Sequence, residues 1–259
     1  ASLADVYINE AFSASHRNHA SICAIPKFLP HALGASFANE ISIINAFFRR
    51  DLSPSIAIVG GRKLQSKVKL LKSLVSKVNK LALGGGIAGA FMAFVGHKAL
   101  KIFNQSDYDA DILEIMDNAR RNDCELILPS DYSALIGEGE SFKHTVIYDD
   151  SHASIFDIGP ESVELFKKHI GECAAVLWNG PVGLFEKSPF DFGTRSLAQE
   201  IARLSIDGKI SSIVGGGDTS YAMKKFGLDE SFSHLSTAGG AFMAYVEGSE
   251  LPGLKAMSL

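Results

Sequence analysis

Short runs of apolar residues alternate with amphipathic segments along the 259-residue chain. Six short runs predict strands, and most of them are continuous rather than alternating, as in a sheet that is covered on both faces. They lie at 55–59, 80–83, 125–128, 174–178, 211–214 and 233–237. Residues 67–81 and 193–204 predict helices, because their apolar positions recur three and four residues apart. The pattern therefore predicts an α/β fold with a parallel, doubly wound (Rossmann-like) sheet flanked by helices.

Glycines cluster directly after five of the six predicted strands. These turns are Gly60-Gly61, Gly84–Gly86, Gly180, Gly215–Gly217 and Gly239-Gly240, and with Gly183 they hold half of the 24 glycines. In an open parallel sheet, ligands bind beyond the carboxyl ends of the strands, where glycine lets backbone amides approach a phosphate. One such turn is explained equally well by tight chain geometry. Five of them at one sheet edge favour a nucleotide site.

Charged side chains accompany three of these turns. Lys63 and Lys67 follow the first glycine pair and are four residues apart, so we expect them to share the first turn of a helix. Two lysines at a helix N-terminus oppose the helix dipole, and a bound polyanion would relieve that penalty. Asp218 closes a triple glycine, where it suits a helix N-cap or, beside phosphates, Mg²⁺. Glu186 follows the fourth glycine turn, where it suits either a ribose-binding acid or an ordinary surface acid.

Two phosphate-binding motifs separate the enzyme classes open to this chain. The P-loop pattern G-x-x-x-x-G-K-[ST] is absent, which argues against a P-loop kinase. Residues Gly84–Gly89 match G-x-G-x-x-G, and Asp107 or Asp109 lies near the spacing of a ribose-binding acid, so an NAD-dependent oxidoreductase is one alternative. That motif accounts for one glycine turn and leaves the other four unexplained. A noncatalytic nucleotide-binding module is a second alternative.

Composition and charge narrow the environment of the protein. The 25 basic and 29 acidic residues give a net charge of −4, so no overall basic field points to nucleic acid or an anionic membrane as a partner. The longest nearly apolar stretch, Gly84–Gly96, is too short to cross a bilayer. Cys23, Cys124 and Cys173 are odd in number and lack metal-ligand spacing, which favours a reducing, cytoplasmic location.

Several motifs together resemble phosphoglycerate kinases over essentially the whole chain. The most specific are LWNGPVGLFE at 177–186 and IVGGGDTSYAMKKFG at 213–227, in that order. The segments DVYINEAFSASHRNHAS, IAIVGGRKLQSK, LALGGGIAGAFM, DIGPES, FSHLSTAGGA and EGSELPGL complete the series. This ordered set is far more specific than the dinucleotide motif alone.

The resemblance implies two α/β domains joined by a helix. Residues 1–25 would be the end of an N-terminal domain that binds 3-phosphoglycerate, 26–48 the linking helix and 49–259 the C-terminal nucleotide-binding domain. The implied reaction, in glycolysis and gluconeogenesis, is reversible phosphoryl transfer between 1,3-bisphosphoglycerate and ADP, which gives 3-phosphoglycerate and ATP with Mg²⁺. A monomer is implied. The chain alone is expected to bind MgADP or MgATP and to turn over poorly, because further triose-phosphate ligands would lie upstream.

The resemblance also implies a role for individual residues. Lys63 would stabilise the transferring phosphoryl group, and Lys67 would contact the nucleotide phosphates and share in catalysis. Asp218 would bind the magnesium, Glu186 the ribose and Arg17 the triose phosphate. The implied contacts from small residues and backbone amides are Gly61, Gly85, Gly86, Pro181, Gly216, Gly217 and Thr219 for the nucleotide, and Gly217 and Gly239 for the moving phosphoryl group.

Four positions or segments depart from the family pattern, and one of them is Ile155, where many members have glycine. Ala238 stands where the family has the first of three glycines, so it would be strained if that position required a positive φ. Arg62 occupies a position that is usually small and adds a charge beside the phosphates. Residues 97–101 differ from the family's glycine-containing segment, so we expect the wall of the adenine pocket to differ there.

Overall fold

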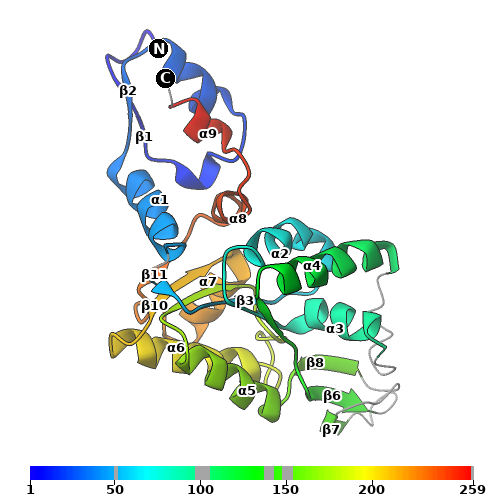
Figure 1. The fold of residues 1–259 in the computed structure, drawn as a ribbon. Coiled ribbons are helices and arrows are strands. Elements are labelled where there is room, and N and C mark those ends of the chain that lie inside the picture. Colours follow the sequence, from blue (N-terminus) through cyan, green and yellow to red (C-terminus); the bar gives the residue numbers. More distant parts are fainter. Residues whose placement is uncertain (50–51, 97–105, 137–142, 148–153, 258–259) are drawn as a thin grey trace.

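A six-stranded parallel sheet forms the centre of the protein. The structure is a computed structural model and describes residues 1–49, 52–96, 106–136, 143–147 and 154–257. The strand order is β11-β10-β9-β3-β4-β5 (Figure 1). The strands are β3 (Ser55–Val59), β4 (Lys80–Leu83), β5 (Glu125–Ile127), β9 (Ala175–Asn179), β10 (Ser211–Gly215) and β11 (His234–Leu235). All six predicted strands are therefore confirmed, and β3 and β4 have the predicted bounds.

Both faces of the sheet are buried. In β3, Ala57 and Val59 pack into one hydrophobic core, while Ile56 and Ile58 pack into another on the opposite face. Successive side chains of a strand point to opposite faces, so a strand between two cores must be apolar at every position. This is the physical reason for the continuous apolar runs in the sequence.

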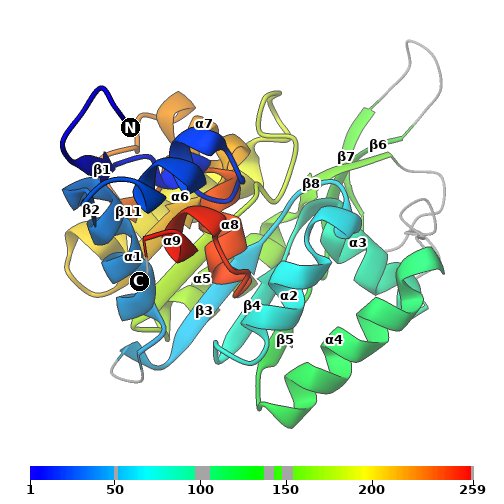
Figure 2. The same ribbon diagram turned by 90° about the horizontal axis from the view of Figure 1, so that it is seen from above.

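Helices cover the sheet on both sides (Figure 2). The core on one side is built with α1 (Ala35–Phe47), α2 (Val68–Leu74), α3 (Gly85–Phe94), α4 (Asp109–Arg121) and α8 (Gly240–Val246). The core on the other side is built with α5 (Pro160–Gly171), α6 (Phe192–Ile206) and α7 (Gly217–Lys225). The two predicted helices correspond to α2 and α6. The predicted doubly wound α/β fold is confirmed.

A small lobe stands apart from the sheet and contains both ends of the chain (Figure 1). It is formed by residues 1–33 together with α9 (Pro252–Lys255), and its strands β1 (Tyr7–Asn9) and β2 (His31–Leu33) pair in parallel. The amide of Gly253 donates a hydrogen bond to the carbonyl of Ser15 (2.9 Å), and a Cβ at Gly253 would lie 2.6 Å from the Ser15 side chain. The last helix is thus fixed on the first turns of the chain.

Helix α1 leads from the small lobe to the sheet. It begins at Ala35, whereas we expected the linking helix to occupy 26–48; the segment before it forms a 3₁₀ turn and β2 instead. The Glu10 carboxylate accepts hydrogen bonds from the amides of Ser36 (3.0 Å) and Phe37 (3.1 Å), which have no partner within the helix. These amides lower the pKa of Glu10. The expected start was wrong because a residue remote in sequence stabilises the actual one.

A three-stranded antiparallel sheet at the edge of the molecule was not predicted. Its order is β7-β6-β8, with β6 (Tyr132–Ile136), β7 (Lys143–Ile147) and β8 (Ser154–Ile158). Tyr132 and Ala134 pack with Met92 of α3, so this sheet lies beside the helix that follows β4 (Figure 1). Within the described ranges, none of the helices combines the length and hydropathy needed to cross a lipid bilayer.

Candidate nucleotide site

The glycine turns after β3, β4 and β9 interlock at the carboxyl edge of the sheet. A Cβ at Gly60 would lie 2.1 Å from the carbonyl oxygen of Pro181, and one at Gly180 would lie 2.1 Å from the carbonyl oxygen of Gly60. A Cβ at Gly86 would lie 2.3 Å from the carbonyl oxygen of Arg62. The three turns therefore touch backbone to backbone, and a side chain at any of these positions would push them apart.

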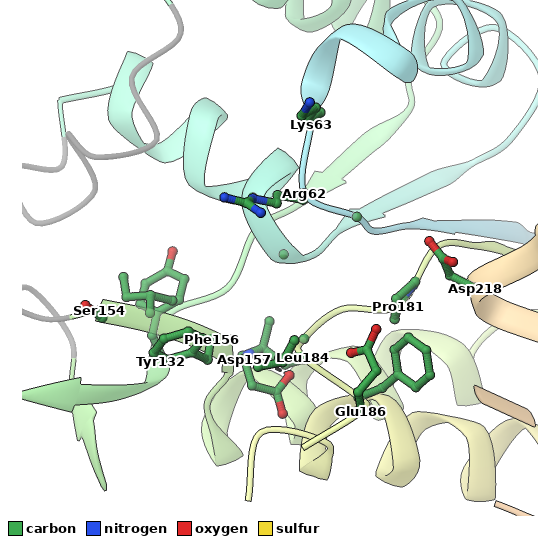
Figure 3. A pocket seen from close by; sticks show the side chains of 17 residues that line it. Arg62, Lys63, Tyr132, Ser154, Phe156, Asp157, Pro181, Leu184, Glu186 and Asp218 are labelled. Atoms are coloured by element: carbon green, nitrogen blue, oxygen red, sulfur yellow. Dashed lines mark hydrogen bonds between the residues drawn. The ribbon is translucent and has the colours of Figure 1, made fainter. Parts of the chain in front are cut away.

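A cleft of about 740 Å³ opens in front of these turns (Figure 3). This volume is within the range of sites for small molecules and cofactors. Seven residues that the sequence singled out line the cleft: Gly61, Lys63, Gly85, Gly86, Pro181, Glu186 and Asp218. Its other lining residues are Arg62, Tyr132, Ser154, Ile155, Phe156, Asp157, Ile158, Gly183, Leu184 and Phe185. Segments far apart in the sequence thus meet at the place that the glycine pattern indicates.

Among the predicted site residues, three charged side chains on the cleft are available to a ligand. Lys63, Glu186 and Asp218 are exposed, and their charged groups make no hydrogen bond or ion pair with another residue in the described part of the chain. Figure 3 shows Asp218 and Glu186 on the same side of the cleft as Pro181. Lys63 precedes a 3₁₀ turn, and Lys67 follows that turn and precedes α2. The expectation that the two lysines share one helical turn is therefore wrong.

Lys67 is not among the residues that line the cleft. Its ammonium group donates a hydrogen bond to Oδ1 of Asn179 and lies 3.3 Å from Sδ of Met243. Burial lowers the pKa of Lys67 to about 8, while the carboxylates of Glu247 and Asp218 raise it. A cation that is partly stripped of water and not fully compensated gains much from a nearby phosphate.

Two polar side chains hold the turns after β9 and β10 together. Asn179 ends β9, accepts the hydrogen bond from Lys67 and donates from Nδ2 to the carbonyl of Gly215 (2.7 Å). The hydroxyl oxygen of Thr219 accepts a hydrogen bond from the amide of Gly180 (2.7 Å). Thr219 is fully buried and lines neither of the two clefts. Sequence reasoning gave no role to Asn179, although its position before a glycine turn was a usable signal.

A second cleft, of about 250 Å³, lies on the other side of the start of α7. It is lined by Gly216, Gly217, Ser220, Tyr221, Lys224, Ser236, Thr237 and Gly239. Asp218 therefore borders the larger cleft while Gly217, its neighbour in the chain, borders the smaller one. A Cβ at Gly217 or Gly239 would have no neighbouring atom within 4 Å. The backbone at these two glycines is open to a ligand.

Arg17 of the small lobe is brought close to the turn before α8. The side chain of Arg17 is exposed, and its Nε donates a hydrogen bond to Nε2 of His16 (3.2 Å). The same His16 nitrogen would lie 3.1 Å from a Cβ at Gly240, which begins α8. The one predicted triose-phosphate ligand is thus bonded to a histidine that lies against the start of α8.

Asp157 is a buried acid on the cleft wall to which sequence reasoning gave no role. Burial raises the pKa of Asp157 to about 8, although the amides of Gly193 (2.6 Å) and Ile158 (2.9 Å), which donate to its carboxylate, act in the opposite direction. A Cβ at Gly183 would lie 2.0 Å from Oδ1 of Asp157. Asp157 therefore packs tightly against the segment that carries Glu186, and a change there would displace that acid.

The residues around Asp218 fit Mg²⁺ bound together with phosphates. Mg²⁺ is usually held by one or two carboxylates, with phosphate oxygens and water completing its shell. Asp218 supplies one exposed carboxylate at the N-terminus of a helix that borders both clefts. Among the described residues, no three His, Cys, Asp or Glu side chains gather into a metal site. The donor set suits a cation that arrives with its nucleotide.

The dinucleotide motif is placed differently from what the oxidoreductase alternative requires. A Rossmann ribose acid belongs at the end of the strand after the motif helix. Asp107 lies in the 3₁₀ turn Ser106–Tyr108, and Asp109 begins α4. The acid after β5 is Asp131, whose carboxylate accepts a hydrogen bond from the amide of Ser162 (2.8 Å) at the start of α5. Neither candidate acid occupies the required strand end.

The structure describes Ala238, one of the departures from the family pattern, but not the segment 97–101. Among the described residues that are not glycine, only Asp123 has a positive φ, so Ala238 is not strained. Its amide donates a hydrogen bond to the Ser236 hydroxyl (3.3 Å). Residues 97–101 lie outside the described residues.

Comparisons with known proteins agree with these motifs. A family model described as phosphoglycerate kinase matches residues 1–249. The phosphoglycerate kinase of Rhodospirillum centenum is 39% identical over 260 residues, which cover 99% of this chain and 66% of that protein. The phosphoglycerate kinase of Methylorubrum extorquens (strain PA1) is 40% identical over 258 residues, which cover 98% of this chain and 64% of that protein.

Two solved structures are similar to the whole chain. One, of phosphoglycerate kinase from Coxiella burnetii, has a TM-score of 0.91 at 34% identity and covers 98% of this chain and 65% of that one. The other, of phosphoglycerate kinase from Pyrococcus horikoshii, has a TM-score of 0.83 at 25% identity and covers 99% of this chain and 64% of that one. The chain thus spans slightly less than two thirds of the length of these proteins.

Proposed function

Because the chain belongs to the phosphoglycerate kinase family, we propose that the protein transfers a phosphoryl group reversibly between 1,3-bisphosphoglycerate and ADP. In this proposal the chain holds MgADP or MgATP in the larger cleft. The observation that carries the proposal is the convergence of Gly61, Lys63, Gly85, Gly86, Pro181, Glu186 and Asp218 on that one cleft. They come from the turns after β3, β4, β9 and β10, at the sheet edge where open α/β sheets bind ligands.

The charges on the cleft suit a nucleotide with its phosphates near α7. Lys63, Lys67 and the open backbone near Gly216 and Gly217 supply positive charge and N–H donors, and Asp218 would hold Mg²⁺ against the phosphates. When bound, the metal neutralises charge on the transferring group. Glu186 would accept hydrogen bonds from the ribose. Lys67 holds its proton at Nζ next to Asn179, ready to pair with a phosphate oxygen.

The second substrate would approach from the small lobe. Arg17 is exposed and carries the planar donor fork that binds oxyanions in a bidentate manner. The smaller cleft is lined by Gly217, from the first turn of α7, and by Gly239, which directly precedes the Gly240 that lies near His16. Phosphoryl transfer depends chiefly on positioning and charge, so approach of the two lobes would align the substrates and exclude water. The carboxyl group of 3-phosphoglycerate would be the acceptor in the reverse direction.

The cellular compartment and the oligomeric state form part of the same proposal. Cys23, Cys124 and Cys173 are free thiols, and burial raises the pKa values of Cys124 and Cys173, to about 12 and about 11. Buried, protonated thiols suit a reducing compartment, and we place the protein in the cytoplasm as a monomer.

Calorimetric titration of the chain with ADP, with and without Mg²⁺, tests the nucleotide site. Lys67→Ala should weaken ADP binding about tenfold or more, because it removes a partly buried cation from the phosphates. Asp218→Asn should abolish the strengthening by Mg²⁺ and leave metal-free binding nearly unchanged. Lys168→Ala and Asp229→Asn change exposed residues on α5 and after α7, remote from both clefts, and serve as matched controls.

Three results would contradict the proposal. ADP affinity that ignores both Lys67 and Mg²⁺ would remove the phosphates from the assigned place. Saturable NAD binding without competition by ADP would favour an oxidoreductase. Tight MgADP binding by a full-length protein that shows no phosphoryl transfer in a coupled assay would leave a noncatalytic nucleotide-binding module.

A further inference from the structure

The end of the larger cleft opposite Asp218 is built differently from the phosphate end. Figure 3 shows Asp218 at one end and Tyr132, Ser154 and Phe156 at the other, with Glu186 on the Asp218 side. Tyr132 and Ile155 pack together against α3, and the ring of Phe156 is held by Phe190 at a centroid distance of 4.8 Å. If the phosphates lie beside Asp218, a nucleotide must place its base at this largely apolar end.

Among the described residues that line the cleft, Arg62 is the one cationic side chain that points toward this end. It is exposed, and in Figure 3 its guanidinium group extends toward the side of Tyr132 and Ser154 and away from Asp218. Within the described parts of the chain its side chain makes no hydrogen bond or ion pair. The expectation that Arg62 adds its charge beside the phosphates therefore differs from where the structure places the group.

The backbone of Arg62 is held firmly, so its side chain starts from a defined place. A Cβ at Gly86 would lie 2.3 Å from the Arg62 carbonyl oxygen, which shows how closely the turns after β3 and β4 pack. The amide of Ile87 donates a hydrogen bond to the carbonyl of Gly61 (3.3 Å), next to Arg62 in the chain. A guanidinium group on a rigid turn, above an apolar floor, is arranged for recognition rather than for general solubility.

Guanidinium chemistry distinguishes the two purine bases. Arginine has N–H donors in a planar fork and no acceptor. Guanine presents two acceptors on one edge, O6 and N7, and arginine binds them together. Adenine presents N7 beside an amino group at C6, which is itself a donor and repels the second N–H. An arginine at a base site therefore favours the 6-keto purine.

We propose that Arg62 reads the purine base and that this chain binds guanine nucleotides at least as tightly as adenine nucleotides. This inference rests on the proposed nucleotide site and adds a base preference to it. Arg62 acts as a specificity residue and takes no part in the transfer itself. The apolar surface formed by Ile155 and Phe156 can pack against either adenine or guanine. The guanidinium group of Arg62 therefore determines the preference between the two bases.

The test measures Mg²⁺-dependent affinities for ADP, GDP and IDP by calorimetry. Inosine shares the 6-keto group of guanine and lacks its 2-amino group, so it isolates the atoms that Arg62 would contact. Arg62→Ala should weaken GDP and IDP about tenfold and ADP less than about threefold. Arg62→Lys keeps the charge and removes the fork, so it should also lose the preference for the keto purines. Arg121→Ala, an exposed arginine at the end of α4, is the matched control.

The outcomes separate this inference from the proposed function. Equal weakening of ADP, GDP and IDP by Arg62→Ala would overturn the inference, because Arg62 would then contact the phosphates or the sugar. An ADP preference in the unaltered chain that Arg62→Ala does not change would overturn it as well. In both cases, retained dependence on Lys67 and Mg²⁺ would leave the nucleotide site intact. Absence of binding by any of the three nucleotides would overturn both. Thermal melting of each variant confirms that the fold is retained.

Discussion

Individual glycines in the turns at the sheet edge fall into two groups, one packed and one open. After β3, β4 and β9, Gly60, Gly86 and Gly180 are enclosed by the backbone of neighbouring turns, with virtual Cβ contacts of 2.1 to 2.3 Å. After β10 and β11, Gly217 and Gly239 have no atom within 4 Å of that position. The first group lets the turns pack together, whereas the second leaves backbone free for a ligand. A glycine-rich sheet edge therefore does not by itself indicate how many turns touch the ligand.

The largest expected effect is the loss of stability at a packed glycine. Gly60→Ala places a methyl group 2.1 Å from the Pro181 carbonyl oxygen, so the turns after β3 and β9 must separate. We expect the free energy of unfolding to fall by about 3 kcal/mol or more. Denaturant unfolding followed by circular dichroism measures it. Gly171→Ala, at the end of α5 with nothing within 4 Å, is the control and should change stability by less than about 1 kcal/mol.

That prediction can break the comparison directly. If Gly60→Ala were as stable as Gly171→Ala, the turn would have room to relax, and the distinction between packed and open glycines would lose its physical basis.

A smaller effect is expected from the pH dependence of ADP affinity, through Lys67. Burial lowers the pKa of Lys67 to about 8, so the neutral amine is populated in the free protein as the pH rises through 8. Only the protonated, charged form of Lys67 can pair with a phosphate. ADP itself stays fully charged above pH 8, because the second pKa of a phosphate monoester is about 6. We expect ADP affinity to fall above pH 8 by up to about tenfold per pH unit.

The measurement is ADP affinity across pH 7 to 10, with Lys67→Met as the comparison. The variant should bind weakly at every pH and show no break near pH 8. Binding near pH 8 should also take up a proton, because the phosphate raises the pKa of Lys67; titrations in buffers of different ionisation enthalpy detect this uptake. A pH profile that is flat for the unaltered chain would show that Lys67 does not pair with the phosphates.

The smallest effect is expected at an open glycine. Gly217→Ala meets no atom within 4 Å and lies in the first turn of α7, so stability should stay within about 1 kcal/mol and rise rather than fall. ADP affinity should drop about threefold, because a methyl group hinders close approach of a phosphate to the backbone. Parallel unfolding and calorimetric experiments separate the two readouts. If Gly217→Ala lost as much stability as Gly60→Ala, Gly217 would belong with the packed glycines and not with the open ones.

The parts of the fold that the sequence predicts are those with local causes. The strands have recognisable apolar runs because each is buried on both faces, and β3 and β4 lie where the runs place them. The start of α1 was missed because the Glu10 carboxylate that stabilises it lies 26 residues from Ser36. The antiparallel sheet β7-β6-β8 was missed because polar residues interrupt its strands, YSALI, KHTVI and SIFDI, so that none of them is a continuous apolar run.

The same distinction holds for the candidate site. Lys63, Glu186 and Asp218 stand beside glycine turns in the sequence and also line the cleft in the structure. The hydrogen bond between Lys67 and Asn179 joins residues 112 positions apart, and no local pattern encodes it. The orientation of Arg62 is likewise a property of the assembled cleft. Side-chain direction depends on neighbours that only the fold brings together.

The attachment of the small lobe has a mechanical consequence. Two stretches of chain connect the sheet to the lobe: α1, and residues 247–251, which join α8 to α9. A lobe joined by a single connection can rotate in any direction. Two separate connections allow rotation mainly about the axis that passes through both. The hydrogen bond from the amide of Gly253 to the carbonyl of Ser15 fixes α9, at the end of the second connection, to the lobe. We expect these two connections to restrict movement of the lobe that carries Arg17 mainly to rotation about one axis.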